Sequence, residues 1–159
     1  MNILIVENDI AIGSIPMELI ERWGYNIANA RTCKDALDKV KQKRFDLILL
    51  DIFLPDGEGH RLIPQFKQLC PGIGIITMTG YNTRELEMEV RQQGILYYMI
   101  KPFETKSLKE LLDHISHKYS KKVNNKYRFS GEKGGDFNQK ANNKIDFQVR
   151  KEVTKKWQN

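Results

Sequence analysis

Five short apolar runs, separated by longer segments with helical periodicity, constrain the fold of this chain more than any other feature. Three of the runs are apolar on both faces, which is typical of parallel strands that helices cover on each side. The second run is more mixed and suits the edge of a sheet. Strands that alternate with helices predict an α/β fold with one parallel sheet. The runs are Ile3–Val6, Tyr25–Ala28, Leu47–Leu50, Ile73–Met78 and Leu96–Ile100.

Helix signals lie between the apolar runs. Thr32 is predicted as an N-cap, with the acid Asp35 three positions later. Asn82 is predicted as a second N-cap, with Glu85 three positions later. Apolar residues at helical spacing predict an amphipathic helix after the last strand. These residues are Leu108, Leu111, Leu112, Ile115 and Tyr119.

The positive charge of the chain is concentrated in its last segment. The 159 residues include 26 basic and 20 acidic side chains, a formal net charge of +6. Of these, 11 basic and 4 acidic residues lie in 121–159, which leaves 15 basic and 16 acidic residues for 1–120. The main domain is therefore not expected to offer a uniformly basic surface to nucleic acid.

Residues 121–159 are predicted as a basic tail that follows a domain of residues 1–120. The tail is rich in Asn, Lys and Gly without a sustained hydrophobic period, which is typical of a linker or a disordered segment. A marginal helix is indicated from about Asp146. Three functions stay open for the tail besides plain disorder: binding nucleic acid through phosphates, docking on an acidic partner, and folding back on the domain.

Composition predicts a soluble protein of a reducing cytoplasm, without contact to a membrane. Hydrophobic residues make up 40% of the sequence, but no apolar run approaches the roughly 18 residues of a membrane span. The first residues do not have the pattern of a signal peptide. The two cysteines, Cys33 and Cys70, form neither a metal-ligand spacing nor a disulfide scaffold.

Polar residues follow the predicted strands at their carboxyl ends, where ligands bind in sheets of this kind. A carboxylate among them can accept a phosphoryl group if the charge on the transferred oxygens is neutralised. A Mg²⁺ ion on neighbouring acids, a lysine, and a hydroxyl with a backbone N–H can neutralise it. The strand-end residues are Glu7, Asn8, Asp9, Asp51, Thr79, Gly80 and Lys101.

Four motifs resemble the receiver domain of bacterial response regulators: "ILIVEND", "DLILLDIFLPDGEG", "IITMTGY" and "YYMIKPF". The similarity covers about residues 2–120. It implies a flavodoxin-like (βα)5 fold whose five-stranded parallel sheet has the order 2-1-3-4-5. It also implies a signalling protein of a two-component system or phosphorelay, which accepts phosphate rather than acting as an enzyme.

The resemblance implies a phosphoacceptor, a magnesium site and a switch. Asp51 matches the phosphoacceptor, Tyr98 matches the switch aromatic residue, and the Lys101–Pro102 bond matches a cis peptide of the family. The residues that contact the phosphoryl group would be Thr79, Gly80 and Lys101, and the metal ligands would be Glu7, Asn8, Asp51 and the backbone carbonyl of Phe53.

The resemblance also implies a route for signalling. Phosphorylated Asp51 would draw in the Thr79 hydroxyl and leave space into which Tyr98 rotates. The surface formed by the helix after Asn82, the strand Leu96–Ile100 and the last helix would then change its preference for partners. The expected partners are a histidine kinase or a phosphotransfer protein, a downstream protein, and a second receiver in a homodimer.

One position departs from the family pattern, because Asn8 stands where most receivers have a second acid. An amide oxygen can ligate magnesium, but it supplies a dipole rather than a charge. Three alternatives follow: weakened magnesium binding with phosphorylation retained, a degenerate receiver that acts as a phosphorylation-independent interaction module, or Asp9 as the replacement ligand. A flavin-binding protein of the same topology is not expected, since "ENDIAIG" lacks a phosphate loop of hydroxyls and glycines.

Two aromatic residues lie near the expected acceptor. Phe53 comes two residues after Asp51, and Tyr81 comes two after Thr79. In the implied fold both flank the path of a hydrolytic water, where they would either slow the loss of phosphate or only cover the rim.

The three histidines of the chain are predicted to face solvent rather than to bind a metal. His60 stands in a loop after a glycine, and His114 and His117 lie three apart on the last helix.

Overall fold

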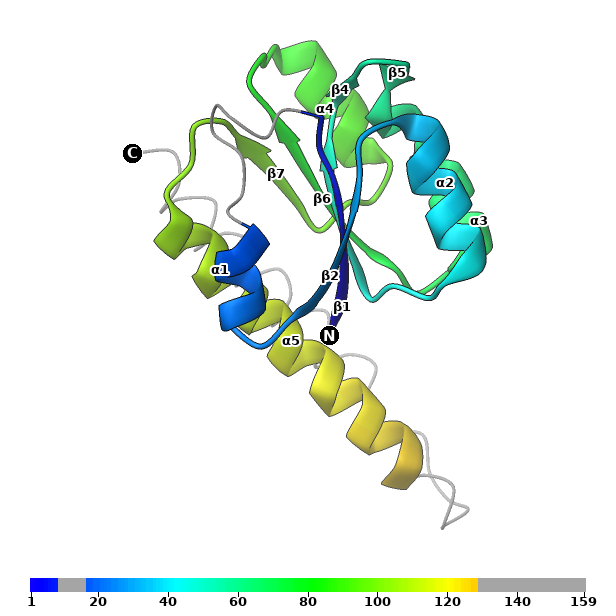
Figure 1. Ribbon diagram of the computed structural model, residues 1–159, viewed down its shortest axis with the longest axis vertical. Coiled ribbons are helices and arrows are strands. Elements are labelled where there is room, and N and C mark those ends of the chain that lie inside the picture. The colour runs from blue at the N-terminus through cyan, green and yellow to red at the C-terminus, as the bar shows by residue number, and fades with distance from the viewer. Residues whose placement is uncertain (9–16, 129–159) are drawn as a thin grey trace. The chain divides into compact units, whose positions relative to one another are not determined.

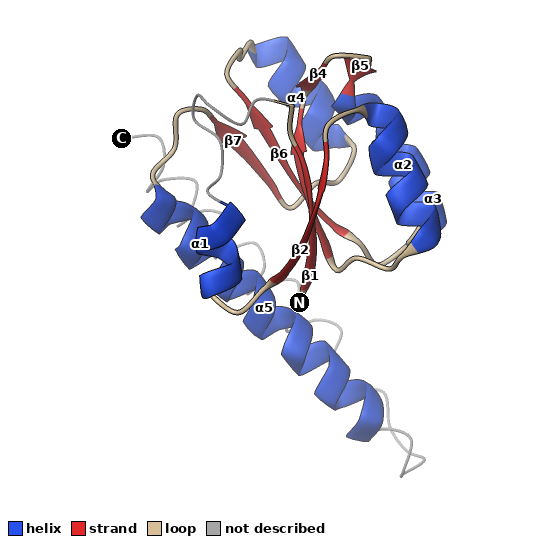
Figure 2. Ribbon diagram, viewed as in Figure 1, coloured by secondary structure: helices blue, strands red, loops and turns tan. Residues whose placement is uncertain are grey.

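The computed structural model describes residues 1–8 and 17–128. Five parallel strands form one sheet in the order β2-β1-β3-β6-β7 (Figures 1 and 2). Since β6 and β7 are the fourth and fifth strands of this sheet, the predicted order 2-1-3-4-5 is confirmed. The strands are β1 (Asn2–Val6), β2 (Asn26–Ala30), β3 (Leu47–Asp51), β6 (Gly74–Thr79) and β7 (Tyr97–Ile100).

Helices occupy the connections between these strands. They are α1 (Met17–Arg22), α2 (Cys33–Gln42), α3 (Ile63–Leu69), α4 (Arg84–Gln92) and α5 (Thr105–Arg128). The connection from β3 to α3 also holds a small antiparallel pair and a 3-10 helix. These are β4 (Phe53–Leu54) with β5 (Gly57–Glu58), followed by η1 (Gly59–Leu62).

The sheet is buried on both faces, which explains why its central strands are apolar throughout. Every residue of β3 and β6 is buried. On one face, Ile48 and Ile75 pack with residues of α2, α3 and α4, among them Phe66. In Figure 1, α1 and the first half of α5 lie on the opposite side of the sheet from α2 and α3. Ile20 and Leu112 are fully buried there.

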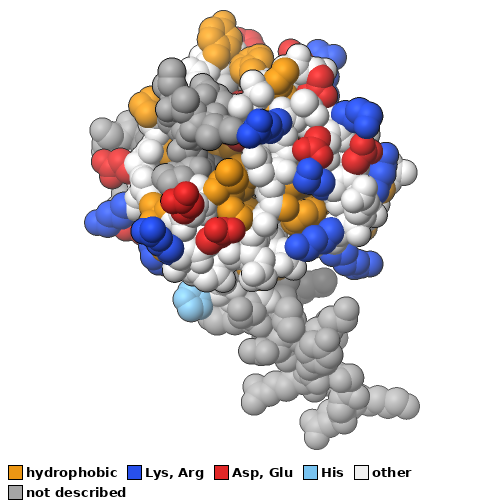
Figure 3. Space-filling model, in the orientation of Figure 1, with side chains coloured by type: hydrophobic (Ala, Val, Ile, Leu, Met, Phe, Trp, Pro, Cys, Tyr) orange, Lys and Arg blue, Asp and Glu red, His pale blue; other side chains and the backbone are white. Residues whose placement is uncertain are grey.

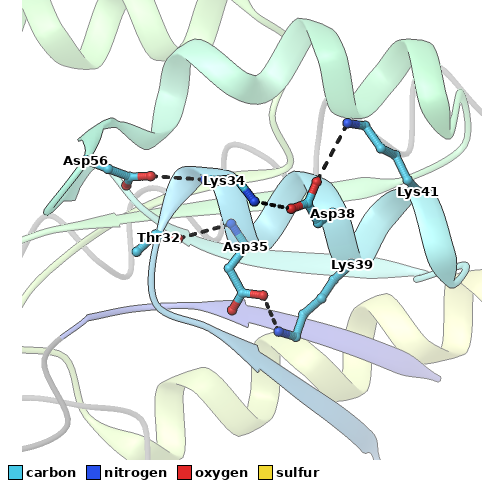
Figure 4. Close-up of polar contacts among 7 residues, drawn as sticks. All are labelled: Thr32, Lys34, Asp35, Asp38, Lys39, Lys41 and Asp56. Carbon is cyan, nitrogen blue, oxygen red and sulfur yellow. Dashed lines mark hydrogen bonds and ion pairs between the residues drawn. The ribbon is translucent and has the colours of Figure 1, made fainter.

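The start of α2 shows how local sequence sets the beginning of a helix. The Thr32 hydroxyl accepts the N–H of Asp35 at 3.0 Å, so the predicted N-cap is confirmed. The Asp56 carboxylate, from the turn between β4 and β5, accepts the N–H of Cys33 at 2.7 Å. It also accepts the N–H of Lys34 at 3.1 Å (Figure 4). These bonds lower the pKa of Asp56 and tie the turn to α2.

Charged side chains of both signs are mixed on the surface. On α2, Lys34 pairs with Asp38 at 2.9 Å, and Lys39 pairs with Asp35 (Figure 4). Acidic and basic side chains are also interspersed over the face drawn in Figure 3. This mixture agrees with the near balance of charge in residues 1–120.

One helix boundary differs from the prediction. The N-cap of α4 is Thr83 rather than Asn82, because the Thr83 hydroxyl accepts the N–H of Leu86 at 3.2 Å. Both residue types are good caps, so residue type alone does not set the position within one residue. The last helix, α5, continues to Arg128.

The chain divides into two units, Met1–His117 and Lys118–Asn159, and the sheet belongs to the first. The predicted linker or disordered segment and the marginal helix from about Asp146 fall largely or wholly in residues 129–159, outside the described part. No helix within the described residues combines the length and the apolar character that a membrane span requires.

Candidate functional site

The register of the sheet brings acids from two adjacent strands together. Val6 of β1 pairs with Leu50 of β3, and the residue after each is an acid, Glu7 and Asp51. Only 6% of the surface of Glu7 and 8% of that of Asp51 are exposed. Because charged groups are seldom buried without a partner, this pair of acids requires a cation.

Lys101 supplies that cation. Its ammonium donates to Asp51 Oδ2 at 2.8 Å and also to Glu7 Oε2. Lys101 comes directly after β7, and its backbone N–H donates to Thr79 O at 2.7 Å, which holds it at the end of β6. The peptide bond between Lys101 and Pro102 is cis, as predicted.

The shared ammonium and the burial shift the acidity of this cluster. Burial raises the pKa of Glu7; the bond from Lys101 opposes this rise and the charge of Asp51 adds to it. Burial by itself would lower the pKa of Lys101, but the bonds to Asp51 and Glu7 outweigh it and raise the pKa. Lys101 therefore stays charged at neutral pH. Two acidic side chains, Glu7 and Asp51, thus share the ammonium of Lys101.

The donor set at this cluster fits a magnesium ion. Glu7 and Asp51 offer carboxylate oxygens, the exposed Asn8 offers an amide oxygen, and Phe53 offers a backbone carbonyl. The N–H of Phe53 donates to Asp51 Oδ1 at 3.1 Å, which brings its backbone to the acid. Within residues 1–8 and 17–128, no three His, Cys, Asp or Glu side chains gather as a metal site. Magnesium often binds through one or two carboxylates and keeps several waters, so two acids suffice. Asp9 lies outside the described residues.

Thr79 lies at the end of β6, beside β3, and the following loop engages its hydroxyl. Thr79 Oγ1 donates to Tyr81 O at 2.7 Å and accepts from Tyr81 N at 3.1 Å. Asp51 pairs with Met78, so Thr79 is one residue beyond the acid in the sheet. The backbone of Gly80 is open, since a methyl group added there would meet no atom within 4 Å. The Thr79 hydroxyl must leave Tyr81 O before it can donate to a group on Asp51.

Tyr98 is held by residues of α4 and of the loop before it. Its ring packs against the core on the side of α4. Its hydroxyl donates to Asn82 Oδ1 at 2.9 Å. The guanidinium carbon of Arg91 lies 5.6 Å from the centre of the ring, within the range of a cation–π contact.

The structure brings Phe53 and Tyr81 together. Their ring centres are 6.1 Å apart, and the ring planes meet at 72°, an edge-to-face contact. Phe53 is 44% exposed and Tyr81 is 64% exposed. Through their backbones, Phe53 is bonded to Asp51 and Tyr81 to Thr79, so the aromatic pair lies at the rim of the acid cluster.

His60 is buried, so the prediction that it faces solvent is wrong. It is only 2% exposed, and its Nε2 lies 3.3 Å from Glu89 Oε1 on α4. The cause is Gly59, whose N–H donates to Ile52 O at 2.7 Å. A methyl group on Gly59 would lie 2.2 Å from Asp51 O. This close approach draws η1 against the sheet and turns the next side chain inward.

The other two histidines, His114 and His117, are exposed on α5, as predicted. The neighbouring Asp113 accepts from Lys109 at 2.6 Å and from the Tyr25 hydroxyl at 2.9 Å. The carboxylate of Asp113 therefore already has hydrogen-bond partners within the protein, which does not favour a metal site.

Sequence analysis does not identify Asn82 and Arg91 as contacts of Tyr98. The spacing of Arg91 from Glu87, four residues on one helix face, is a visible signal for an ion pair. This spacing does not reveal the contact of Arg91 with the Tyr98 ring, because Tyr98 belongs to β7 and the contact depends on how α4 packs on that strand.

Comparison with known proteins agrees with this arrangement. The family model described as "Response regulator receiver domain" matches residues 3–113. The transcriptional regulatory protein ZraR of Escherichia coli is 34% identical over 121 residues, which make up 76% of this chain and 27% of ZraR. The chain thus spans about a quarter of the length of that curated relative.

Solved structures have the same fold. A CheY-like receiver domain protein of Methanospirillum hungatei matches with a TM-score of 0.68 and 31% identity, over 76% of this chain and 97% of that one. The response regulator TrrA of Thermotoga maritima, solved in complex with Mg²⁺-BeF, matches with a TM-score of 0.63 and 25% identity, over 72% of this chain and 97% of TrrA. The chain belongs to the response regulator receiver domain family, the receivers of two-component systems.

Proposed function

We propose that the chain accepts a phosphoryl group on Asp51 from a histidine kinase or a phosphotransfer protein. The observation that carries this proposal is the pairing of Asp51 with Lys101 at the carboxyl end of the sheet. A nucleophilic carboxylate with a fixed ammonium beside it meets the two main requirements for phosphoryl transfer, positioning and charge neutralisation.

The transfer exchanges one bond for another. An oxygen of Asp51 attacks the phosphorus of a phosphohistidine, an O–P bond forms, and the N–P bond breaks with its electron pair left on the imidazole. The Lys101 ammonium neutralises charge on one phosphoryl oxygen. The Thr79 hydroxyl and the N–H of Gly80 donate to the others, once Thr79 has left the carbonyl of Tyr81.

A magnesium ion is proposed for the same site, held by Glu7, Asn8, Asp51 and the backbone carbonyl of Phe53. When bound, the ion neutralises charge on the transferred oxygens. The complex of TrrA with Mg²⁺-BeF supports a metal in this family. Asn8 supplies no charge, so the affinity for magnesium is expected to be lower than with an acid at this position.

The signalling surface is proposed to be the face of α4, β7 and α5. Met88 on α4 and Ile100 at the end of β7 are 52% and 49% exposed. Exposed apolar side chains of this size suit contact with a protein, either a downstream partner or a second receiver chain. Tyr98 lies between these elements and would report the state of Asp51 to them.

Phosphate-affinity electrophoresis tests the proposal directly. The protein is incubated with a small-molecule phosphodonor and MgCl₂, and the modified residue is identified by mass spectrometry. We expect a shifted band that carries phosphate on Asp51. Asp51→Asn should abolish the shift, and Asp38→Asn, which alters an exposed acid of α2, should leave it unchanged.

Asn8 favours a second candidate, a degenerate receiver that binds partners without phosphoryl chemistry. The same experiment separates the two functions. Absence of modification in both the wild type and the Asn8→Asp variant, which restores the acid, would support the degenerate receiver.

We propose that the receiver ends near residue 120. Binding of nucleic acid by the basic tail that follows is a third candidate; loss of salt-sensitive binding on truncation at residue 121 would support it.

A further inference from the structure

The loop after β6 carries two hydrogen bonds that involve both residues of the proposed switch. Thr79 Oγ1 donates to the carbonyl of Tyr81 at 2.7 Å. The next residue, Asn82, accepts the hydroxyl of Tyr98 at 2.9 Å. Thr79 and Tyr98 are therefore connected through adjacent residues of one short loop.

Tyr98 lies where it can respond to a movement of Thr79. In the sheet, Tyr98 pairs with Thr77. Side chains two residues apart on a strand point to the same face, so Thr77, Thr79 and Tyr98 share one face of the sheet. The Tyr98 ring packs against the core to which α4 contributes Leu86 and Val90. A change at Thr79 can thus reach α4 through this ring.

A second contact holds the ring from α4 itself. Arg91 lies over the Tyr98 ring at 5.6 Å, and its Nε donates to Glu87 Oε1 at 2.7 Å, which orients the guanidinium. Burial raises the pKa of Tyr98, so at neutral pH its hydroxyl is protonated and acts as the donor to Asn82. The ring is therefore fixed at its hydroxyl and over its face.

We propose that Asn82 and Arg91 are positioning residues that hold Tyr98 against α4 and thereby oppose the switched state of the receiver. The Asn82 contact is coupled to Thr79, because a hydroxyl that turns toward Asp51 gives up the Tyr81 carbonyl and releases the loop. The Arg91 contact does not involve that loop, so it resists the switch independently of it. The trigger rests on the proposed phosphorylation of Asp51, whereas the two contacts on Tyr98 do not.

A contact made only in the resting state shifts the equilibrium by its own free energy when it is removed. Loss of one hydrogen bond should favour the switched state by about two- to tenfold. Loss of an exposed cation–π contact should favour it by about two- to fivefold. These shifts are large enough to measure in a titration.

The test titrates the full chain with beryllofluoride, a phosphoryl mimic, at fixed MgCl₂, and follows NMR signals of the α4 amides and the Tyr98 ring. We expect Asn82→Ala and Arg91→Ala to lower the concentration for half conversion by those factors. Asn82→Asp keeps an acceptor and Arg91→Lys keeps a cation, so both should stay close to wild type. Arg84→Ala, which removes an exposed arginine from the first turn of the same helix, is the matched control and should have no effect.

Double variants separate positioning from a general loosening of α4. Tyr98→Phe lacks the hydroxyl, so Asn82→Ala should add no further shift to it, whereas Arg91→Ala should still do so. Equal midpoints for wild type, Asn82→Ala and Arg91→Ala would overturn the inference. If neither the wild type nor Asn8→Asp responds to beryllofluoride, the proposed phosphorylation would be overturned instead. In that case the inference is tested by the NMR signals of the Tyr98 ring without beryllofluoride. Identical ring signals in the wild type, Asn82→Ala and Arg91→Ala would overturn the inference, and ring signals that differ from wild type in the two variants would support it.

Discussion

The ammonium of Lys101 donates to Asp51 Oδ2 at 2.8 Å and at the same time to Glu7, so one nearly buried cation balances two buried acids. The exposed fractions of the three side chains are 13% for Lys101, 12% for Asp51 and 7% for Glu7. The carboxylates that Lys101 contacts are also those proposed to hold magnesium, so we expect the lysine to matter most for the stability of the protein without the metal.

Lys101→Ala should destabilise the metal-free protein, because it leaves Glu7 and Asp51 buried side by side without a cation. We expect the free energy of unfolding to fall by about 3 kcal/mol, as when a buried pair loses one partner. Urea unfolding at pH 7 measures the loss, and MgCl₂ should recover part of it. Lys109→Ala removes one member of an exposed pair and should cost less than about 1 kcal/mol. Similar losses for the two variants would contradict a special role of Lys101.

Asn8→Asp should strengthen magnesium binding, because it adds a charge to a site that has two acids. An increase of about tenfold corresponds to 1.4 kcal/mol, a modest gain for one added charge. Calorimetric titration with MgCl₂ measures the affinity of both proteins. Without metal, the added acid should lower the stability, since three carboxylates would then share one ammonium. An unchanged affinity would show that position 8 does not contact the ion.

The sheet and the acid cluster could be predicted because both depend on local pattern and topology. Strands buried on both faces must be apolar throughout, so β1 and β3 are visible as continuous runs. Parallel strands end at the same edge, which is why Asp51 and Lys101 could be expected together although they are 50 residues apart.

Features that depend on one close tertiary contact could not be predicted. His60 is buried because Gly59 approaches the carbonyl of Asp51, and nothing in the residue types near His60 indicates that contact. The partners of Tyr98 come from α4 and the loop before it, and their identity depends on how that helix packs.

His60→Leu should stabilise the protein. The Nδ1 atom of His60 is buried without a hydrogen-bond partner in the part of the chain that the structure describes. An apolar side chain of similar size removes that unsatisfied group and should raise the free energy of unfolding by about 1 kcal/mol. Glu89→Gln, measured beside it in urea, isolates the effect of the Glu89 charge near Nε2. A loss of stability in His60→Leu would mean that the contact with Glu89 outweighs the buried nitrogen.

The aromatic pair at the rim should slow the loss of phosphate from Asp51. The edge-to-face pair of Phe53 and Tyr81 lies at the rim of the acid cluster, and its rings offer no charged group that could act as a base on a water. The double variant Phe53→Asn, Tyr81→Glu should speed dephosphorylation by about tenfold, a small part of what a positioned acid–base group can contribute. Decay of the phosphorylated protein measures the rates. Leu69→Asn, at an apolar residue of α3 that is 43% exposed, controls for surface polarity. Equal rates for the double variant and the wild type would exclude this role.

The stabilising contribution of Asp113 should disappear in acid. Its bond from Lys109 and, to a lesser extent, that from Tyr25 hold the pKa of Asp113 below its usual value of 3.8. A carboxyl group whose pKa is lower in the folded state stabilises the fold above its unfolded pKa and loses this effect as the pH falls through the folded value. Burial and the bond to Asp113 raise the pKa of Tyr25 to about 12, so its hydroxyl stays protonated in this range. Asp113→Asn should therefore cost stability at pH 7, by less than about 1 kcal/mol because the pair is exposed. The difference should shrink as the pH falls below the usual pKa of 3.8 and disappear once the carboxyl group is protonated in the folded protein. Urea unfolding of both proteins at a series of pH values measures it, and a difference that grows toward low pH would contradict the assigned direction.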